Sequence, residues 1–462
     1  MPTHVIILAA GEGKRMKSDL PKVAHKVLGR SLLNWVIEST RPLEPASTVV
    51  VVGHGAHHVK SLLPDEVVEA HQEDQLGTGH ATQIGLDALG VIEPDDTVVI
   101  LYGDTPLLTS GLLTELTDLA HDETARLVSA RLEDPSGYGR LVRDENGEIS
   151  GIVEHRDCTP DQLELDEVNA GIYAVRAGRL TETLKRVDND NAQGEYYLTD
   201  IVGFLVADGD RLTAVEATPE EVMGINSQDQ LAAARKELQR RTNQRLMEAG
   251  VAIIDPDRTY IDESVEVEPG ATIYPGTHLE GQTKVGAGSR VGPEVFAVDS
   301  TIGSDVTVWY AVLRQAVVGD ACEVGPYASL RPGTVLEEGA KLGTFVETKN
   351  TTMGAGAKAN HLAYLGDATV GARTNIGAGV ITVNYDGVKK SHTEIGEDAF
   401  VGSDTMLVAP LRIGDRGTTG AGSVITKDVS DDALAIERSD QREIPGYAQR
   451  REARKAANTA ED

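Results

Sequence analysis

Glycines and cations gather near the start of the chain in a pattern that suits phosphate binding. Gly11 and Gly13 follow an apolar segment, and Arg15 and Lys22 come shortly after. Glycines leave backbone N–H groups open to a ligand, and cationic side chains pair with phosphate oxygens, so a nucleoside triphosphate fits. The pattern is neither a complete G-x-G-x-x-G fingerprint nor a Walker A loop. A purely structural turn explains the glycine pair equally well.

A carboxylate stands at the end of a second apolar segment. Asp104 follows Thr97–Tyr102 and Gly103. At the carboxyl end of a strand, such a carboxylate can hold Mg²⁺ against a triphosphate. Because Thr105 and Pro106 come next, Asp104 also fits the N-cap of a helix. The residues alone leave both interpretations open.

A histidine lies where a repeated pattern breaks in the second half of the chain. His361 belongs to the break at Asn360–Tyr364, and another break spans Asn384–Lys390. We expect such breaks to be insertions on one face, which often carry binding. Histidine suits general base catalysis because its ordinary pKa is close to neutral. A lone histidine in a loop is more often a surface polar residue.

The repeat itself has a period of six residues. It runs from about 261 to 424, and the phase is carried by aliphatic residues followed by glycine, proline or acidic residues: Ile261, Val267, Ile273, Leu279, Val285, Val291, then Val318, Val324, Leu330, Leu336, Leu342, then Ile395, Val401, Leu407 and Ile413. Neither a helix nor an alternating strand generates this period, whereas hexapeptide coils of a β-helix do. We therefore predict a parallel β-helix whose coils stack through backbone hydrogen bonds.

The first half of the chain alternates strand and helix patterns. Strands are expected at His4–Ala10, Thr48–Gly53 and Thr97–Tyr102, with helices at Ser31–Glu38 and Ser110–Leu119. This order predicts a mostly parallel α/β sheet, in which ligands bind at the carboxyl ends of the strands.

A helical segment separates these two regions. Ser227 and Gln230 have the spacing of a capping box, and helix-forming residues continue to Glu248 before Gly250. We divide the chain into an α/β domain at 1–226, a linker helix at 227–250 and a β-helix domain with a C-terminal tail at 251–462. The tail after Pro445 is expected to be a frayed helix or disordered.

Composition narrows the partners and the compartment. The 462 residues suffice for two or three domains, and a formal net charge of −30 argues against nucleic acid as a partner. Cys158 and Cys322 stand far apart in no metal or redox spacing, which favours a reducing cytoplasm. No apolar run is long enough to span a membrane, and Met1–Ala10 is expected to be a buried strand, not a signal peptide.

Several motifs resemble a known enzyme family. Leu8–Arg15 with Leu20–Lys22 is similar to the signature of the sugar-1-phosphate nucleotidyltransferases. Gln75–Ala81, Tyr102–Leu107 and Gly194–Asp200 narrow the resemblance to bifunctional bacterial uridylyltransferase–acetyltransferases, and it covers nearly the whole chain. The resemblance implies a Rossmann-like nucleotidyltransferase domain, a left-handed parallel β-helix of hexapeptide repeats and a homotrimer formed through the β-helix. One departure is Ala170, where threonine is expected.

The resemblance also implies residue roles in the first half. Arg15 and Lys22 would stabilise charge during transfer, and Asp104 and Asn226 would hold Mg²⁺. The residues that would bind UTP and UDP-N-acetylglucosamine are Leu8, Ala9, Ala10, Gly11, Lys22, Gln72, Gly77, Thr78, Tyr102, Gly103, Asp104, Gly139, Glu154, Asn169 and Asn226.

In the β-helix the resemblance makes His361 the general base, which Glu347 would orient. Glucosamine-1-phosphate would be held by Arg331, Lys349, Tyr364 and Asn375. Acetyl-CoA would be contacted by Ala378, Asn384, Tyr385, Ser403, Ala421 and Arg438.

The implied function is synthesis of UDP-N-acetylglucosamine, a cell-wall precursor, by acetyl transfer from acetyl-CoA followed by uridylyl transfer from UTP. Two alternatives remain: a nucleotidyltransferase whose β-helix only regulates or oligomerises, and a non-catalytic assembly subunit of similar build. The residues around His361 argue against the first alternative, and Arg15, Lys22, Asp104 and Asn226 argue against the second.

Overall fold

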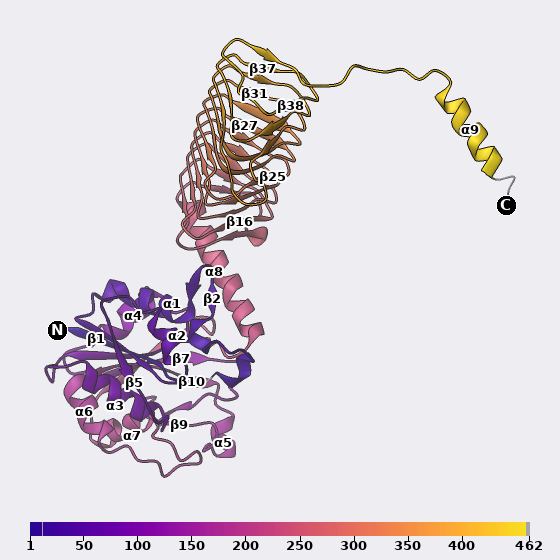
Figure 1. Cartoon of the computed structure of the whole chain (residues 1–462). Helices are drawn as coiled ribbons and strands as arrows, with labels where there is room; N and C mark the ends of the chain where they lie inside the picture. Colours follow the sequence, from indigo (N-terminus) through magenta and orange to yellow (C-terminus); the bar gives the residue numbers. More distant parts are fainter. Residues whose placement is uncertain (12, 459–462) are drawn as a thin grey trace. The chain divides into compact units, whose positions relative to one another are not determined.

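The computed structural model describes residues 1–11 and 13–458, which form two units (Figure 1). The first unit comprises Met1–Gln244 with Ile261–Glu263, and the second comprises Arg245–Tyr260 and the chain from Ser264 onward. The division after Gln244 falls inside helix α8 (Gln228–Glu248), within the segment that the sequence assigns to a linker.

A twisted sheet organises the first unit. Its strand order is β11-β7-β10-β6-β1-β4-β5. The bounds are β1 (Thr3–Ala9), β4 (Ser47–Val52), β5 (Val67–His71), β6 (Thr97–Tyr102), β7 (Ala125–Arg131), β10 (Glu167–Arg176) and β11 (Leu212–Ala217). β1, β4, β5 and β6 run parallel, while β10 runs antiparallel to β6 and β7. The hairpin β8 (Arg140–Arg143) and β9 (Ile149–Val153) joins at β10. The mostly parallel α/β sheet that the sequence predicts is confirmed.

Helices cover both faces of this sheet. On one face, valines and leucines of α1 (Leu32–Thr40), α2 (Ala56–Lys60) and α4 (Ser110–Thr117) pack against Val5 and Ile7. On the other face, α3 (Thr78–Ala88), α6 (Ala177–Leu184) and α7 (Asp200–Ala207) pack against Ile6 and Leu8. Alternate residues of a strand point to opposite faces, so the apolar run of β1 supplies both cores.

Helix α8 packs against the first unit along part of its length. Leu231, Ala234 and Leu238 share a buried cluster with Met16 and Leu107. At the start of the helix, the Gln230 side chain accepts a hydrogen bond of 2.7 Å from the backbone N–H of Asn226. The sequence predicted Ser227, the next residue, as its partner in a capping box. The helix therefore fixes the backbone of Asn226, a predicted metal ligand.

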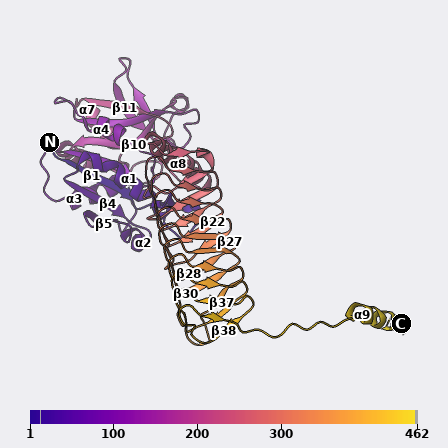
Figure 2. The same ribbon diagram turned by 90° about the horizontal axis from the view of Figure 1, so that it is seen from above.

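The second unit is a parallel β-helix. Its short strands run from β12 (Ala252–Ile253) to β39 (Leu434–Ala435), and each pairs in parallel with a strand of the next coil. Glu266 pairs with Lys284, and Lys284 with Thr301, so one coil takes 17 or 18 residues. Figure 2 shows these coils stacked along the unit. Most residues of the six-residue phase are fully buried, which confirms the predicted architecture.

The two breaks of the repeat differ in structure. Between β32 (Ile381–Val383) and β33 (Thr393–Ile395) the chain makes a true insertion, because Ala368 pairs with Thr393, 25 positions on. At Asn360–Tyr364 the prediction of an insertion is wrong: β29 (Lys358–His361) and β30 (Tyr364–Val370) continue the coil, and Glu347 pairs with Tyr364, only 17 positions on. The six-residue pattern of aliphatic residues is interrupted there, but no residues are inserted into the coil.

Beyond the coils, the segment after Pro445 contains helix α9 (Tyr447–Asn458), whose described side chains are exposed. A search of the described residues finds no helix with the length and apolar character that crossing a membrane requires.

Candidate active sites

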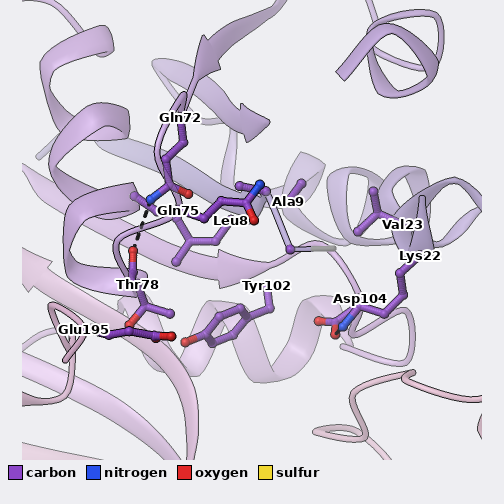
Figure 3. Close-up of a pocket in the computed structure, with 14 residues that line it drawn as sticks. Leu8, Ala9, Lys22, Val23, Gln72, Gln75, Thr78, Tyr102, Asp104 and Glu195 are labelled. Atoms are coloured by element: carbon purple, nitrogen blue, oxygen red, sulfur yellow. Dashed lines mark hydrogen bonds and ion pairs between the residues drawn. The ribbon is translucent and has the colours of Figure 1, made fainter. Parts of the chain in front are cut away.

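The carboxyl ends of β1, β5 and β6 line a cavity of about 390 Å³ (Figure 3). A volume of this size is typical of small-molecule sites. Gly103, also predicted to contact UTP, is not among the residues that line this cavity, and its backbone N–H donates to the Leu8 carbonyl oxygen (2.9 Å). The first cavity brings together most of the residues predicted to contact UTP: Leu8, Ala9, Ala10, Gly11, Lys22, Gln72, Gly77, Thr78, Tyr102 and Asp104. Gln75 and Glu195 also line it, and the residue-by-residue prediction did not include them.

One side chain of this cavity has a defined hydrogen-bonding direction. The buried Gln72 amide nitrogen lies 3.2 Å from both the Gly77 carbonyl oxygen and His80 Nδ1. A carbonyl oxygen can only accept, so the nitrogen of Gln72 must donate there, and its own carbonyl oxygen stays available as an acceptor. An acceptor at that point suits the N3–H donor of a uracil ring.

A second cavity, of about 340 Å³, adjoins the first at Tyr102 and Asp104, which line both. The Thr199 hydroxyl donates to Glu154 (3.1 Å), and burial raises the pKa of Glu154. Buried acceptors of this kind suit the hydroxyl and amide groups of a sugar. The second cavity gathers the remaining predicted residues of the first unit: Arg15, Gly139, Glu154, Asn169 and Asn226.

The second cavity is shaped by local backbone features. Asn169 is held by Tyr173, whose hydroxyl lies 2.7 Å from the Asn169 amide nitrogen, and by the Gly171 N–H. Gly171 has a positive φ of 74°, and a Cβ at this position would collide with the Tyr102 ring. Glycine at 171 therefore allows Tyr102 to stand between the cavities. Ala170, the departure from the family pattern, also lines this cavity.

Asp104 and Asn226 face each other across a lysine. Lys22 Nζ donates to Asp104 Oδ2 and, at 3.0 Å, to Asn226 Oδ1. The Lys22 and Asp104 side chains are only 15% and 14% exposed. A carboxylate and an amide oxygen are ligands that Mg²⁺ takes, and the ammonium shows that this position stabilises positive charge. Asp104 is not a helix N-cap, because α4 begins later and is capped by Thr109.

The loop between β7 and β8 is held by a buried cation that the sequence did not single out. Arg140 is 2% exposed, and its guanidinium donates to the carbonyl oxygens of Pro135 (2.8 Å) and Tyr138 (2.6 Å). Gly139 follows directly in this loop and accepts from the Asn169 N–H (2.9 Å). Arg140 thus fixes the backbone around Gly139. In the sequence, the position of Arg140 directly after Gly137 and Gly139 could have indicated this role.

On the β-helix, His361 lies in a column of stacked residues at one corner of successive coils. Asn375 pairs with Lys358 and with Phe400, and Phe400 pairs with Thr418. Backbone bonds at the corner keep the same order, from Asp404 N to Ala378 O (2.7 Å) and from Gly422 N to Ser403 O (2.8 Å). Lys358, Asn375, Phe400 and Thr418 are therefore stacked in successive coils. The residues three positions after each of them lie at the following corner: His361, Ala378, Ser403 and Ala421.

Arg438 extends this column, since its guanidinium donates to the Ala421 carbonyl oxygen (3.0 Å). His361, Ser403 and Ala421 are exposed, and the small side chains leave room along the column. The predicted base and four of the residues predicted to contact acetyl-CoA therefore share one edge of the rod.

Cations gather around the next corner of the same coils. Arg331 pairs with Glu347 (2.9 Å), the carboxylate predicted to orient His361. Lys390 and Arg331 both lower the pKa of Lys349, Lys390 most strongly, while Asp367 opposes the shift. Like charges placed this close indicate an anion site. Lys390 was not predicted; it closes the insertion, where it bridges back to Tyr385.

Two of the remaining predicted residues, Tyr364 and Asn384, lie side by side near this cationic group, and Asn375 does not. A Cβ on Gly366 would lie 2.5 Å from the Tyr364 hydroxyl and 2.8 Å from the Asn384 amide nitrogen, so these groups lie beside each other. Asn384 also donates to Asp367 (2.5 Å). Tyr385 is 56% exposed on the insertion. Asn375 lies on another face, on the strand that leads to the His361 column.

Comparison with known proteins agrees with this architecture. Residues 5–190 match the MobA-like NTP transferase domain family. A relative from Caldanaerobacter subterraneus, named "Bifunctional protein GlmU", is 45% identical over 96% of this chain and 97% of its own length. Relatives of the same name from Streptomyces avermitilis and Thermobifida fusca are 46% and 47% identical, covering 100% and 97% of this chain and 97% and 95% of their own lengths. The chain belongs to the GlmU family.

In this GlmU-family chain, Asp104 and Asn226 are the side chains expected to hold a metal ion. Within the part of the chain that the structure describes, no group of three or more His, Cys, Asp or Glu side chains is placed to hold a metal ion. One carboxylate and one amide still fit Mg²⁺, which typically takes one or two protein ligands and completes its shell with phosphates and water.

Proposed function

We propose that this GlmU-family chain makes UDP-N-acetylglucosamine by two successive transfers. The second unit moves an acetyl group from acetyl-CoA to the amino group of glucosamine-1-phosphate. The first unit then joins N-acetylglucosamine-1-phosphate to the uridylyl group of UTP and releases pyrophosphate. The observation that carries the proposal is the pair of cavities meeting at Tyr102 and Asp104, since uridylyl transfer needs a nucleotide and a sugar phosphate end to end.

In the uridylyl step, a phosphate oxygen of the sugar attacks the α-phosphorus of UTP. The bond from that phosphorus to the oxygen bridging to the β-phosphate breaks, and pyrophosphate leaves. Such transfers are accelerated by positioning and charge neutralisation. Lys22 and Arg15 neutralise phosphate charge from the first and second cavity respectively. Magnesium held by Asp104 and Asn226 would supply further charge neutralisation.

Base recognition and sugar recognition fall to different residues. The Gln72 carbonyl oxygen accepts N3–H of uracil, and cytosine is disfavoured because its N3 is itself an acceptor. Glu154 and Asn169 contact the sugar.

In the acetyl step, His361 removes a proton from the amino group of glucosamine-1-phosphate. The nitrogen attacks the thioester carbonyl carbon, the C–S bond breaks, and CoA leaves as the thiol after taking up a proton. Arg331, Lys349 and Lys390 hold the sugar phosphate. The pantetheine arm lies along Ala378, Ser403 and Ala421, with Arg438 near the CoA phosphates.

We further propose that the enzyme works in the cytoplasm as a trimer whose β-helices lie side by side. The exposure of His361, Ser403 and Ala421 supports this, because an acetyl-CoA arm bound to a bare edge would stay in water. A neighbouring rod would supply the missing wall.

Two assays test the function on the full chain. UTP, Mg²⁺ and N-acetylglucosamine-1-phosphate should yield pyrophosphate, and acetyl-CoA with glucosamine-1-phosphate should yield free CoA thiol. Pyrophosphate without thiol release would favour a β-helix that only regulates or oligomerises. If neither pyrophosphate nor CoA thiol is released, the alternative of a non-catalytic assembly subunit is favoured.

A further inference from the structure

Lys22 holds both side chains that are expected to bind the divalent cation. Its ammonium donates to Asp104 Oδ2 and Asn226 Oδ1, and Figure 3 shows Lys22 and Asp104 pointing toward each other at one end of the cavity. An ammonium is a compact point charge with three donors, and it meets the same two oxygens that a dication would take.

The ammonium and a dication exclude each other at this position. The oxygens of Asp104 and Asn226 contact Lys22 Nζ directly, so an ion placed between them would stand within a few ångströms of a second positive charge. Two positive charges this close repel each other even near a protein surface, and the repulsion is larger for a dication. Lys22 must withdraw before a metal ion binds.

Withdrawal is costly unless Lys22 finds another acceptor. The Lys22 side chain is 15% exposed. A buried ammonium without a hydrogen-bond acceptor destabilises the folded protein. Its backbone is also fixed, because Lys22 opens a short 3₁₀ turn and its Cβ lies against Gly13. Only the flexible end of the side chain can move, and the first cavity that it lines is where the triphosphate binds.

We propose that Lys22 is a built-in competitor of the divalent cation, which yields Asp104 and Asn226 only when nucleotide phosphates offer it new acceptors. Free protein therefore binds the ion weakly, and the triphosphate raises the affinity for the ion. By linkage, the ion raises the affinity for the triphosphate by the same factor. The inference rests on the nucleotide site of the proposed function and adds a binding order to it.

Metal binding to the full-length protein without substrate tests the proposal. Mn²⁺ serves as the probe, with free Mn²⁺ counted by electron paramagnetic resonance. We expect Lys22→Met to bind Mn²⁺ at least roughly tenfold more tightly than wild type. The gain should disappear in Lys22→Met combined with Asp104→Asn. Circular dichroism checks that each variant is folded.

Arg15→Met is the matched control for a general charge effect. Arg15 lines the adjoining cavity and is exposed, and among the described residues no hydrogen bond joins it to Asp104 or Asn226. We expect its Mn²⁺ affinity to stay within about threefold of wild type. An equal gain in Arg15→Met and Lys22→Met, or no gain in Lys22→Met, overturns the proposal.

A second measurement uses wild-type protein and keeps the test valid if Lys22→Met does not fold. A non-hydrolysable UTP analogue should tighten Mn²⁺ binding by at least roughly tenfold beyond what the analogue binds by itself. No tightening overturns the competition. Because no turnover is measured, a failed uridylyl assay with intact competition would contradict only the proposed function.

Discussion

Two cations of the first unit, Lys22 and Arg140, are largely buried and held by acceptors, whereas two lysines on the β-helix are open to solvent and lie close to each other. Lys22 is held by Asp104 and Asn226, and Arg140 by backbone carbonyls. On the β-helix, Lys349 and Lys390 lie close enough to lower the pKa of Lys349. The charge of Lys22 is thus already compensated by protein groups, whereas the two lysines on the β-helix have no acceptor between them in the described part of the chain and suit an anion.

The difference follows from the two architectures. A parallel sheet gathers strand ends and loops from distant parts of one chain around an enclosed crevice. A β-helix repeats the same edge in every coil, so residues at one corner form columns such as the one from His361 to Ala421. A site on a rod needs either a bound ligand or another surface to exclude water.

Replacing His361 should separate the two activities most clearly. We expect His361→Ala to lower acetyl transfer on the order of a hundredfold to ten-thousandfold, because the general base is lost. Uridylyl transfer should stay within about twofold, since its residues lie in the first unit. CoA thiol release and pyrophosphate release are measured on one preparation. His392→Ala, an exposed histidine that contacts Thr369, is the control. Retained acetyl transfer in His361→Ala would show that His361 is not the base.

Asp104→Asn should produce the opposite pattern. Loss of the carboxylate removes charge from the metal site, and we expect uridylyl transfer to fall on the order of a hundredfold to a thousandfold. Acetyl transfer should be unchanged. Asp95→Asn, an aspartate of the same unit away from both cavities, controls for charge. If acetyl transfer falls equally, the two sites are not independent.

The anion site on the β-helix is probed by Lys390→Ala. A charge-assisted hydrogen bond contributes about 1.5–3 kcal/mol, so KM for glucosamine-1-phosphate should rise roughly tenfold to a hundredfold with kcat little changed. Lys389→Ala, the adjacent lysine, should have a smaller effect. A fall in kcat at constant KM would mean that Lys390 acts in the chemistry and not in binding.

The smallest effect concerns stability of the first unit. Burial raises the pKa of Asp200 to about 6, and Asp188, Glu154 and Asp157 add to the shift. An acid with a raised pKa binds its proton more tightly in the folded state, so the stability it adds at low pH is lost as pH rises through about 6. Asp200→Asn should therefore stabilise the protein by about 1 kcal/mol at pH 7.5, after allowance for its partial exposure.

Thermal unfolding at pH 7.5 and pH 4.5 measures this effect, and the gain should be much smaller at pH 4.5, where the folded carboxyl is protonated. Asp161→Asn, an exposed aspartate on α5 (Pro160–Leu163), is the control. An equal gain at both pH values would show that charge on Asp200 is not the cause.

The sequence by itself determined the architecture, and it predicted candidate residues for both sites. The six-residue period has one structural explanation, because an inward aliphatic residue must recur once per side of a coil. The apolar strands followed by Gly11 and Asp104 placed these two residues at one sheet edge, the family resemblance added Gln72, and all three line one cavity.

Only the tertiary structure decided how side chains pair across distant segments. Lys22 meets Asp104 and Asn226, Glu347 meets Arg331, and Lys390 returns beside Lys349. The break at Asn360–Tyr364 also proved to be continuous coil, since backbone pairing persists where the aliphatic rhythm is lost. Such contacts depend on coil length and loop path, which set distances between residues far apart in the chain and leave no periodic trace in the sequence.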